Sequence, residues 1–265
     1  MRFPHPRKRF GQHFLIDHNI VNKILIRAEV HPHEHVLEIG PGRGALTKRL
    51  CQVASRVLAI EIDVELFAYL QTELQGFENV EVVLGDALDF SYTNLSHNMV
   101  VVANLPYNIS TPLLFKLFEA RALIDRMILM VQLEVARRIV ANAGTREYGV
   151  LSVLSQYFAD VELAFKVPRT CFSPRPDVES AIIELRPKSS EQIGIEQECE
   201  AFVRVVKAAF SHRRKTLFNA MRDAGFHAHV LQSGFEMATI DGRCRAETLN
   251  VKDFQRLTQA LHPSS

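Results

Sequence analysis

The chain has 265 residues, 47% of them hydrophobic, and a formal net charge of +1. A chain of this size and composition can bury a full hydrophobic core in one large domain or in two unequal ones. No apolar run approaches the roughly 18 residues that span a bilayer, and the basic start at residues 1–9 is not followed by the apolar stretch of a signal peptide. We therefore expect a cytoplasmic protein with no membrane partner.

Charge and cysteine patterns narrow the possible partners. Residues 201–265 carry ten Lys or Arg against five Asp or Glu, and Arg7-Lys8-Arg9 forms a second basic cluster. Basic faces of this kind suit a polyanion, because phosphate contacts release counterions; solvated helix faces are the alternative. The four cysteines lack the paired spacing of a zinc site or a disulfide framework, so we expect no bound metal.

The chain begins with a basic arm over residues 1–15, in which Phe10 and Phe14 stand among polar and charged residues. That mix fits contact with nucleic acid or a cofactor, or an arm whose phenylalanines pack into the core. Helical spacing of apolar residues begins at Ile20 and predicts a helix after the arm.

An apolar strand over residues 36–39 runs into a turn with glycine at 40, 42 and 44, and helical spacing follows over residues 45–53. Glycine allows a sharp turn and close approach of a ligand. The turn also matches a dinucleotide-binding fingerprint loosely. However, Pro41 removes a backbone N–H that would bind a pyrophosphate, which favours a nucleoside ligand such as S-adenosylmethionine. A turn that only joins strand to helix is the alternative.

Two more strands, predicted over residues 56–60 and 80–84, are each followed by an acidic residue. Glu61 is placed to accept both ribose hydroxyls of a nucleoside. It can instead be a surface carboxylate at the start of the next helix, where Asp63 is the better cap. Asp86 can accept the exocyclic amine of an adenine ring, or form an Asx-turn with its own backbone.

A fourth apolar strand over residues 99–103 ends in Asn104-Leu105-Pro106-Tyr107. The proline pushes Leu105 towards an extended conformation, so that its carbonyl and the Asn104 side chain can both extend beyond the sheet as acceptors. Tyr107 supplies a flat aromatic face. Two acceptors beside an aromatic ring fit a planar amine, such as the N6 group of adenine.

Further elements are predicted at residues 126–131 (strand), 132–141 (helix), 151–158 (helix), 161–167 (strand) and 180–186 (strand). The loop between the last two strands contains Phe172 beside two prolines that stiffen it. Phe172 is a candidate second wall against a target base, or a core phenylalanine under a long loop.

Residues 187–196 are polar and lack periodicity, so we place a domain boundary there. The expected domains are residues 1–190, including the arm, and a helical domain at residues 197–265. An amphipathic helix that contains Phe202 leads into Arg213-Arg214-Lys215. These cations predict a phosphate-binding site; complementing a helix dipole is the alternative.

Six stretches, taken in order, carry a family resemblance: Arg7–Leu15 (RKRFGQHFL), Glu38–Gly42 (EIGPG), Gly85–Ala87 (GDA), Asn104–Ser110 (NLPYNIS), Phe172–Pro176 (FSPRP) and Phe210–Leu217 (FSHRRKTL). Together they resemble the ribosomal RNA adenine N6-dimethyltransferases, and among these the bacterial enzymes of the small-subunit (16S) RNA. The resemblance covers nearly the whole chain.

The resemblance implies an α/β fold: a Rossmann-like class I methyltransferase with a seven-stranded, mostly parallel sheet and a small all-α C-terminal domain. It implies transfer of methyl groups from S-adenosylmethionine to N6 of two adjacent adenines near the 3′ end of 16S rRNA, within the small ribosomal subunit. The products are N6,N6-dimethyladenosines and S-adenosylhomocysteine. Neither a metal nor DNA is expected to take part, and the protein is expected to be a monomer.

The resemblance also assigns residues to roles. Those implied in cofactor binding are Gln12, His13, Leu15, Gly40, Gly42, Glu61, Ile62, Asp86, Ala87 and Asn104. Those expected at the target base are Asn104, Leu105, Pro106, Tyr107 and Phe172. Those expected to bind RNA are Arg7, Lys8, Arg9, Arg213, Arg214 and Lys215. Two positions depart from the pattern, because many relatives have Asn at position 13 and a basic residue at position 177.

Three other functions fit parts of the sequence. The nearest is a dimethyltransferase of large-subunit (23S) RNA. A nucleotide-dependent dehydrogenase is disfavoured by Pro41 and by the turn from Asn104 to Tyr107. A non-catalytic RNA-binding or assembly factor is disfavoured by the intact pair of acceptors in that turn.

Overall fold

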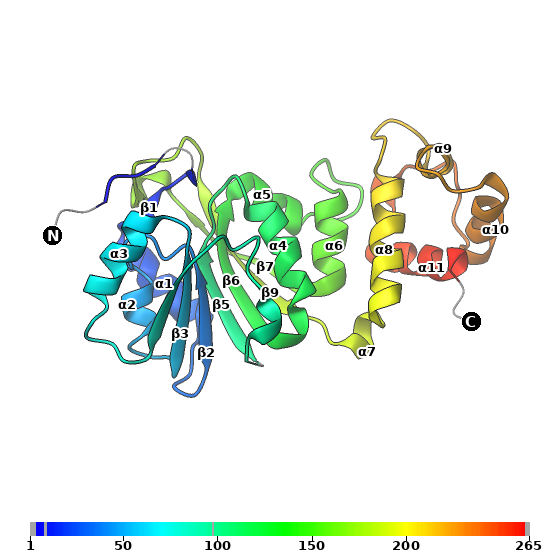
Figure 1. Ribbon diagram of the computed structural model, residues 1–265. Coiled ribbons are helices and arrows are strands. Elements are labelled where there is room, and N and C mark those ends of the chain that lie inside the picture. Colours follow the sequence, from blue (N-terminus) through cyan, green and yellow to red (C-terminus); the bar gives the residue numbers. More distant parts are fainter. Residues whose placement is uncertain (1–3, 8–9, 97, 263–265) are drawn as a thin grey trace. The chain divides into compact units, whose positions relative to one another are not determined.

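The structure of the protein, a computed structural model, describes residues 4–7, 10–96 and 98–262 (Figure 1). Lys8 and Arg9 lie outside the described residues. Internal contacts divide the chain into two compact units, each built from two segments. Unit 1 is Met1–Ala136 with Val161–Pro187, and unit 2 is Arg137–Asp160 with Lys188–Ser265.

Unit 1 is built around a seven-stranded sheet, and all seven predicted strands are present. Across the sheet the order is β4 (Val80–Leu84), β3 (Arg56–Glu61), β2 (His35–Ile39), β5 (Met99–Asn104), β6 (Ile124–Gln132), β9 (Ser180–Pro187) and β7 (Ala159–Val167). The five strands from β4 to β6 pair in parallel, and β9 runs antiparallel to β6. The predicted mostly parallel sheet is therefore confirmed.

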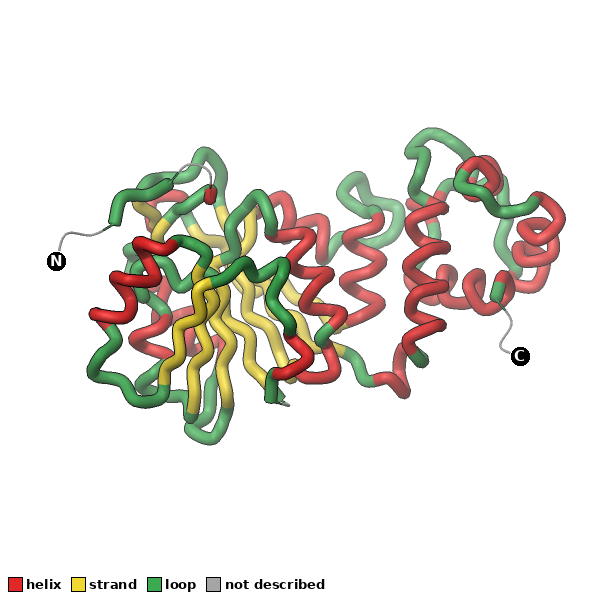
Figure 2. Tube along the Cα trace, in the orientation of Figure 1, coloured by secondary structure: helices red, strands yellow, loops and turns green. Residues whose placement is uncertain are grey.

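Helices lie on both sides of this sheet (Figure 2). Those of unit 1 are α1 (His18–Ala28), α2 (Thr47–Leu50), α3 (Val64–Glu73) and α4 (Ser110–Glu119), and α5 (Leu133–Ile139) crosses the unit boundary. Helix α1 begins where the Asp17 side chain accepts hydrogen bonds from the N–H groups of Asn19 and Ile20. Its apolar positions pack with alternate residues of the sheet, such as Val100 and Val102, in one buried cluster.

The helix after the glycine turn is shorter than predicted. Periodicity indicated a helix over residues 45–53, but only Thr47–Leu50 is α-helical, with turns on both sides. The physical reason lies in Gly40, Gly42 and Gly44, whose φ angles of 68°, 57° and 77° are left-handed and keep the chain out of a helix until residue 47.

A second, very small sheet was not predicted. Strand β1 (Phe14–Leu15) pairs antiparallel with β8 (Phe172–Ser173), so that Leu15 lies opposite Phe172. This pairing joins the end of the N-terminal arm to the proline-containing loop before β9.

Unit 2 consists mainly of helices. They are α6 (Val150–Phe158), α7 (Ser190–Ile193), α8 (Glu196–Ala209), α9 (Leu217–Asp223), α10 (Ala228–Ala238) and α11 (Val251–Leu261). Short 3-10 helices in the described part of both units include Tyr92–Asn94, Arg121–Leu123, Arg169–Cys171 and Ala246–Thr248. None of the helices in the described part of the chain is long and apolar enough to cross a bilayer.

Helix α6 packs with the C-terminal helices. The Tyr157 ring stacks on Phe202 of α8 with centroids 3.6 Å apart, and its hydroxyl donates to the carbonyl of Ile193 at 2.5 Å. Tyr148, just before α6, donates to the carbonyl of Leu249 at 2.9 Å. The contact-based division therefore differs from the expected domains, 1–190 and 197–265, because these aromatic contacts group α6 with unit 2.

Candidate active site

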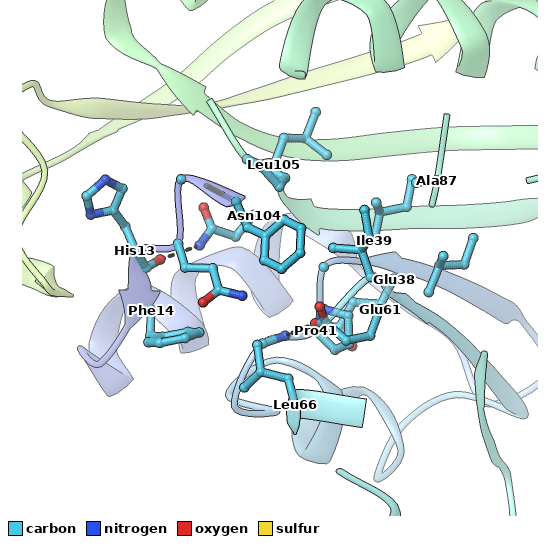
Figure 3. Close-up of a pocket in the computed structure, with 18 of the residues that line it drawn as sticks. His13, Phe14, Glu38, Ile39, Pro41, Glu61, Leu66, Ala87, Asn104 and Leu105 are labelled. Atoms are coloured by element: carbon cyan, nitrogen blue, oxygen red, sulfur yellow. Dashed lines mark hydrogen bonds between the residues drawn. The ribbon is translucent and has the colours of Figure 1, made fainter. Parts of the chain in front are cut away.

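A pocket of about 210 Å³ opens at the carboxyl ends of the parallel strands β2, β3, β4 and β5, with the N-terminal arm along one side (Figure 3). Ligand sites of doubly wound sheets form at this edge because the glycine turn and the polar residues after each strand meet there. The predicted residues that line it are Gln12, His13, Leu15, Gly40, Gly42, Glu61, Ile62, Asp86, Ala87, Asn104, Leu105, Pro106 and Tyr107.

The glycine turn is held against its neighbours by backbone contacts. The Gly40 N–H donates to the carbonyl of Ile60 at 3.0 Å, and the Gly42 N–H donates to Glu61 Oε2 at 3.1 Å. A Cβ at position 42 would lie 3.1 Å from the nearest carbon of the Phe14 ring. A larger residue here would require the Phe14 ring to shift by a few tenths of an ångström and would be strained by the left-handed φ of 57°, so the position favours glycine.

Glu61 is buried, with 3% of its surface exposed, and is not the surface carboxylate of the alternative interpretation. Its Oε1 accepts from the Asp63 N–H at 2.9 Å and its Oε2 accepts from Gly42. Burial raises the pKa of Glu61 to about 7, although these two backbone hydrogen bonds oppose the rise. Each oxygen keeps a further lone pair, so the group can accept two hydroxyls from the pocket.

Sequence reasoning missed a second buried carboxyl group, Glu38, which also lines the pocket. Glu38 is 1% exposed, and its Oε2 has no hydrogen-bond partner among the described residues. Burial raises the pKa of Glu38 to about 8, and the nearby charge of Glu61 adds to the rise. In the sequence Glu38 shows only as a lone acid inside the apolar strand before the glycine turn, which marks a buried carboxyl group but not one that faces a cavity.

At the end of β5, the Asn104 side chain is oriented by the arm. Its Nδ2 donates to the backbone carbonyl of His13 at 3.1 Å, and Figure 3 shows this bond from the arm to the strand end. Because the amide nitrogen faces His13, Oδ1 is left as an acceptor without a hydrogen bond from the described residues. The Leu105 N–H donates to the carbonyl of Met130 at 3.1 Å, which holds the following turn against β6.

Tyr107 is held from two sides. Its hydroxyl lies 2.6 Å from Ser180 Oγ, and its ring stacks on the His13 imidazole with centroids 5.5 Å apart. Burial raises the pKa of Tyr107, so the phenol stays neutral. The His13 Nδ1 lies 2.8 Å from the carbonyl of Pro174, which can only accept, so this nitrogen carries the proton.

Asp86 forms the Asx-turn that was the alternative to a contact with adenine: its Oδ1 accepts from the Leu88 N–H at 2.9 Å. It nevertheless lines the pocket and retains Oδ2 as an acceptor.

Phe172 is not where a second wall would be. It is 3% exposed, belongs to the same buried cluster as Ile20 and Ile24, and is not among the residues that line the pocket. The physical reason is its pairing with Leu15, which leaves the ring inside the core beside the arm. This placement agrees with the alternative of a core phenylalanine, and the expected role of Phe172 against a base stays a prediction without support from the pocket lining.

The predicted RNA-binding residues divide into two groups. Arg7 and Lys215 are paired with carboxylates of the protein: Arg7 Nη2 lies 2.5 Å from Glu65 Oε1, and Lys215 Nζ lies 2.5 Å from Asp223 Oδ2. Arg213 and Arg214 are exposed in a turn before α9, and neither forms an ion pair within the described part of the chain.

Comparison with known proteins adds to this geometry. Residues 5–262 match the family described as ribosomal RNA adenine dimethylase. The ribosomal RNA small subunit methyltransferase A of Moorella thermoacetica is 45% identical over 97% of this chain and 92% of its own length. The protein of the same name from Syntrophotalea carbinolica is 43% identical over 97% of both chains.

Two solved structures are similar as well. A dimethyladenosine transferase from Plasmodium falciparum matches with a TM-score of 0.81 at 30% identity, over 92% of this chain and 96% of that one. The 23S rRNA methyltransferase ErmE matches with a TM-score of 0.73 at 28% identity, over 94% and 99%. The full-length family match and the similarity to these relatives lead to one conclusion: the chain belongs to the ribosomal RNA adenine dimethylase family.

Proposed function

We propose that this protein transfers methyl groups from S-adenosylmethionine to N6 of two adjacent adenines near the 3′ end of 16S rRNA in the small ribosomal subunit. It acts as a cytoplasmic monomer and requires neither a metal nor DNA. The observation that carries the proposal is the free Oδ1 of Asn104 at the edge of a pocket that also contains the buried acid Glu61.

The residues present fit the proposed cofactor. Glu61 retains two lone pairs for the ribose hydroxyls, Asp86 Oδ2 can accept an adenine amine, and the glycine turn leaves the backbone open to the ligand. Pro41 lacks an N–H at the place where a pyrophosphate would be bound. When bound, S-adenosylmethionine supplies a methyl group that its sulfonium makes electrophilic.

The chain activates the amine by orientation and not by a strong base. The N6 lone pair of adenine is conjugated into the ring, so the amine is a poor nucleophile. Asn104 Oδ1 and the Leu105 carbonyl accept its two hydrogen atoms, which favours a pyramidal nitrogen and stabilises the positive charge that develops on it. Tyr107, fixed by Ser180 and His13, supplies the face on which the target base stacks.

The two proposed RNA-binding regions lie in different segments. Arg213 and Arg214 are exposed and form no ion pair with any described residue, so both can pair with RNA phosphates. Arg7 can contribute to RNA binding only if it leaves its carboxylate partners, since they already neutralise its charge.

A second candidate is methylation of large-subunit RNA, which the similarity to the ErmE structure favours. The more similar relatives bear the name of a small-subunit enzyme, and this supports the first choice.

One assay distinguishes the two substrates. Labelled methyl donor is offered with undermethylated small subunits, with large-subunit RNA or with DNA, and nuclease digests are analysed for dimethyladenosine. We expect the product with small subunits alone. Label in the large-subunit RNA would support the second candidate, and no transfer to any of the three would refute methyltransferase function.

A further inference from the structure

One buried carboxylate, Asp63, connects the N-terminal arm to Glu61. Asp63 is 1% exposed, and its own N–H donates to Glu61 Oε1 at 2.9 Å. Its Oδ2 accepts from Gln12 Nε2 at 3.1 Å, and its Oδ1 lies 3.5 Å from Arg7 Nη1. Arg7, Gln12, Asp63 and Glu61 thus form one continuous chain of contacts, which we call the Asp63 network.

The hydrogen bonds of the Asp63 network have a fixed direction. The Arg7 backbone N–H donates to Gln12 Oε1 at 2.7 Å, and Gln12 Nε2 donates in turn to Asp63. A backbone N–H can only donate and an ionised carboxylate can only accept, so the Gln12 amide fits in one orientation. The network therefore requires an acceptor at position 63.

Capping of α3 alone does not account for this arrangement. The cap uses Oδ1, which accepts from the Glu65 N–H at 3.0 Å. The contacts to Gln12 and Arg7 are additional, and they come from the segment that continues into Phe10 to Leu15 along the pocket. A buried acid that serves two segments at once has a role beyond the helix end.

We propose that Asp63 is a positioning residue, which holds the arm against the side of the pocket that contains Glu61 and so determines the affinity for the methyl donor. This inference rests on the proposed function. At the other end of the arm, the His13 carbonyl and the β1–β8 pairing hold the chain independently of Asp63. Near its start, Arg43 donates to the Pro4 carbonyl at 2.9 Å. Loss of the Asp63 contacts would therefore loosen the arm most at Arg7 and Gln12.

The substitution that tests this is Asp63→Asn. Asparagine caps a helix as well as aspartate does, but it turns an amide NH₂ towards that of Gln12 and removes the charge opposite Arg7. We expect S-adenosylmethionine to bind about tenfold more weakly in calorimetry, the effect of losing one hydrogen bond to a charged group. KM for the methyl donor should rise by a similar factor, with kcat within about twofold of the wild-type value.

Two further variants isolate the direction of the hydrogen bonds. Gln12→Glu alone places a carboxylate against Asp63 and should also weaken binding and speed tryptic cleavage of the arm; the cleavage tests the inference even if Asp63→Asn fails to fold. The double variant Gln12→Glu/Asp63→Asn restores acceptor and donor in exchanged places, and should bind at least about threefold more tightly than Gln12→Glu. Both variants carry the same change at position 12, so any direct contact of that residue with the methyl donor cancels in this comparison. Glu65→Gln removes the charge of the exposed partner of Arg7 and is the matched control. It should change the affinity for S-adenosylmethionine by less than about twofold.

Limited trypsin digestion gives a readout that needs no ligand. Cleavage at Arg7-Lys8-Arg9 should be about tenfold faster in Asp63→Asn and return towards the wild-type rate in the double variant. Wild-type affinity and wild-type cleavage in Asp63→Asn would overturn the inference, and so would a double variant no better than either single one. If the wild-type protein binds no S-adenosylmethionine, the proposed function fails, and the digestion pattern still decides whether Asp63 holds the arm.

Discussion

Replacing Asn104 by alanine is the most direct test of the proposed mechanism. The substitution removes Oδ1, the acceptor that the structure leaves free, and also the donor bonded to the His13 carbonyl at 3.1 Å. The Leu105 carbonyl remains, so one of the two proposed acceptors is lost. Loss of one preorganised contact at a centre of developing charge costs about 100-fold to 1,000-fold in rate, and we expect about 100-fold because the second acceptor stays.

Asn104→Ala should lower the rate of methyl transfer and leave the protein folded. The Asn104–His13 hydrogen bond contributes about 1 kcal/mol to the free energy of unfolding, too little to unfold a domain of this size. The assay is single-turnover methyl transfer to small subunits at saturating methyl donor, with donor affinity measured separately by calorimetry. Asn142→Ala, at an exposed asparagine of unit 2, is the matched control. A single-turnover rate near that of wild type would remove Asn104 from the mechanism.

Four further predictions follow from the pocket and its surroundings. Gly42→Ala should lower both the free energy of unfolding, by about 1–3 kcal/mol, and donor affinity, because a methyl group meets the Phe14 ring and the φ of 57° is strained. Donor affinity should rise between pH 6 and pH 8, by about tenfold, as Glu61 with its pKa of about 7 ionises to accept the ribose hydroxyls; Glu61→Gln should abolish the dependence. Because the pKa of Glu38 is raised by burial from 4.5 to about 8, the folded state holds a proton that the unfolded chain loses, so the free energy of unfolding should fall as pH rises across that window. Glu38→Gln should make this slope shallower in urea titrations and leave the part below about pH 7 that Glu61 contributes in the same direction. Phe172→Ala should reduce the free energy of unfolding by about 3–5 kcal/mol, as expected for a core phenylalanine.

Each of these has a contrary outcome. An unchanged unfolding midpoint in Gly42→Ala would show that the turn can move away from the arm. Donor affinity that is flat with pH would exclude titration of Glu61 in this range. An equal slope in wild type and Glu38→Gln would assign the pH response to other groups. If the Phe172→Ala variant is as stable as wild type but inactive, the Phe172 ring contacts the target base and not the core.

The sheet and its binding edge could be predicted because they depend on local patterns. Each strand shows as an apolar run, and the carboxyl ends of parallel strands must meet at one edge. Glu61, Asp86 and Asn104 therefore come together although 43 positions separate the first from the last. The Asp63 cap of α3 was likewise predictable from the preference of aspartate for helix starts.

The arm and Phe172 could not be placed in the same way. Their contact is a two-residue pairing between segments more than 150 positions apart, too short to leave a periodic signal. Whether Phe172 faced a ligand or the core depended on that pairing alone. Glu38 was missed for a different reason: its neighbours identified a buried strand, and no pattern distinguishes a structural acid from one that faces a cavity.

The division of the chain into two discontinuous units limits how the protein can be shortened. The backbone leaves unit 1 after Ala136, returns at Val161 and leaves again after Pro187. A truncation at residue 187 would therefore remove α8 but keep α6, and expose the Tyr157 ring that Phe202 covers. A catalytic fragment would have to close the gap between residues 136 and 161 with a new linker, and any transplant of the C-terminal helices into a relative would have to carry residues 137–160 along with them.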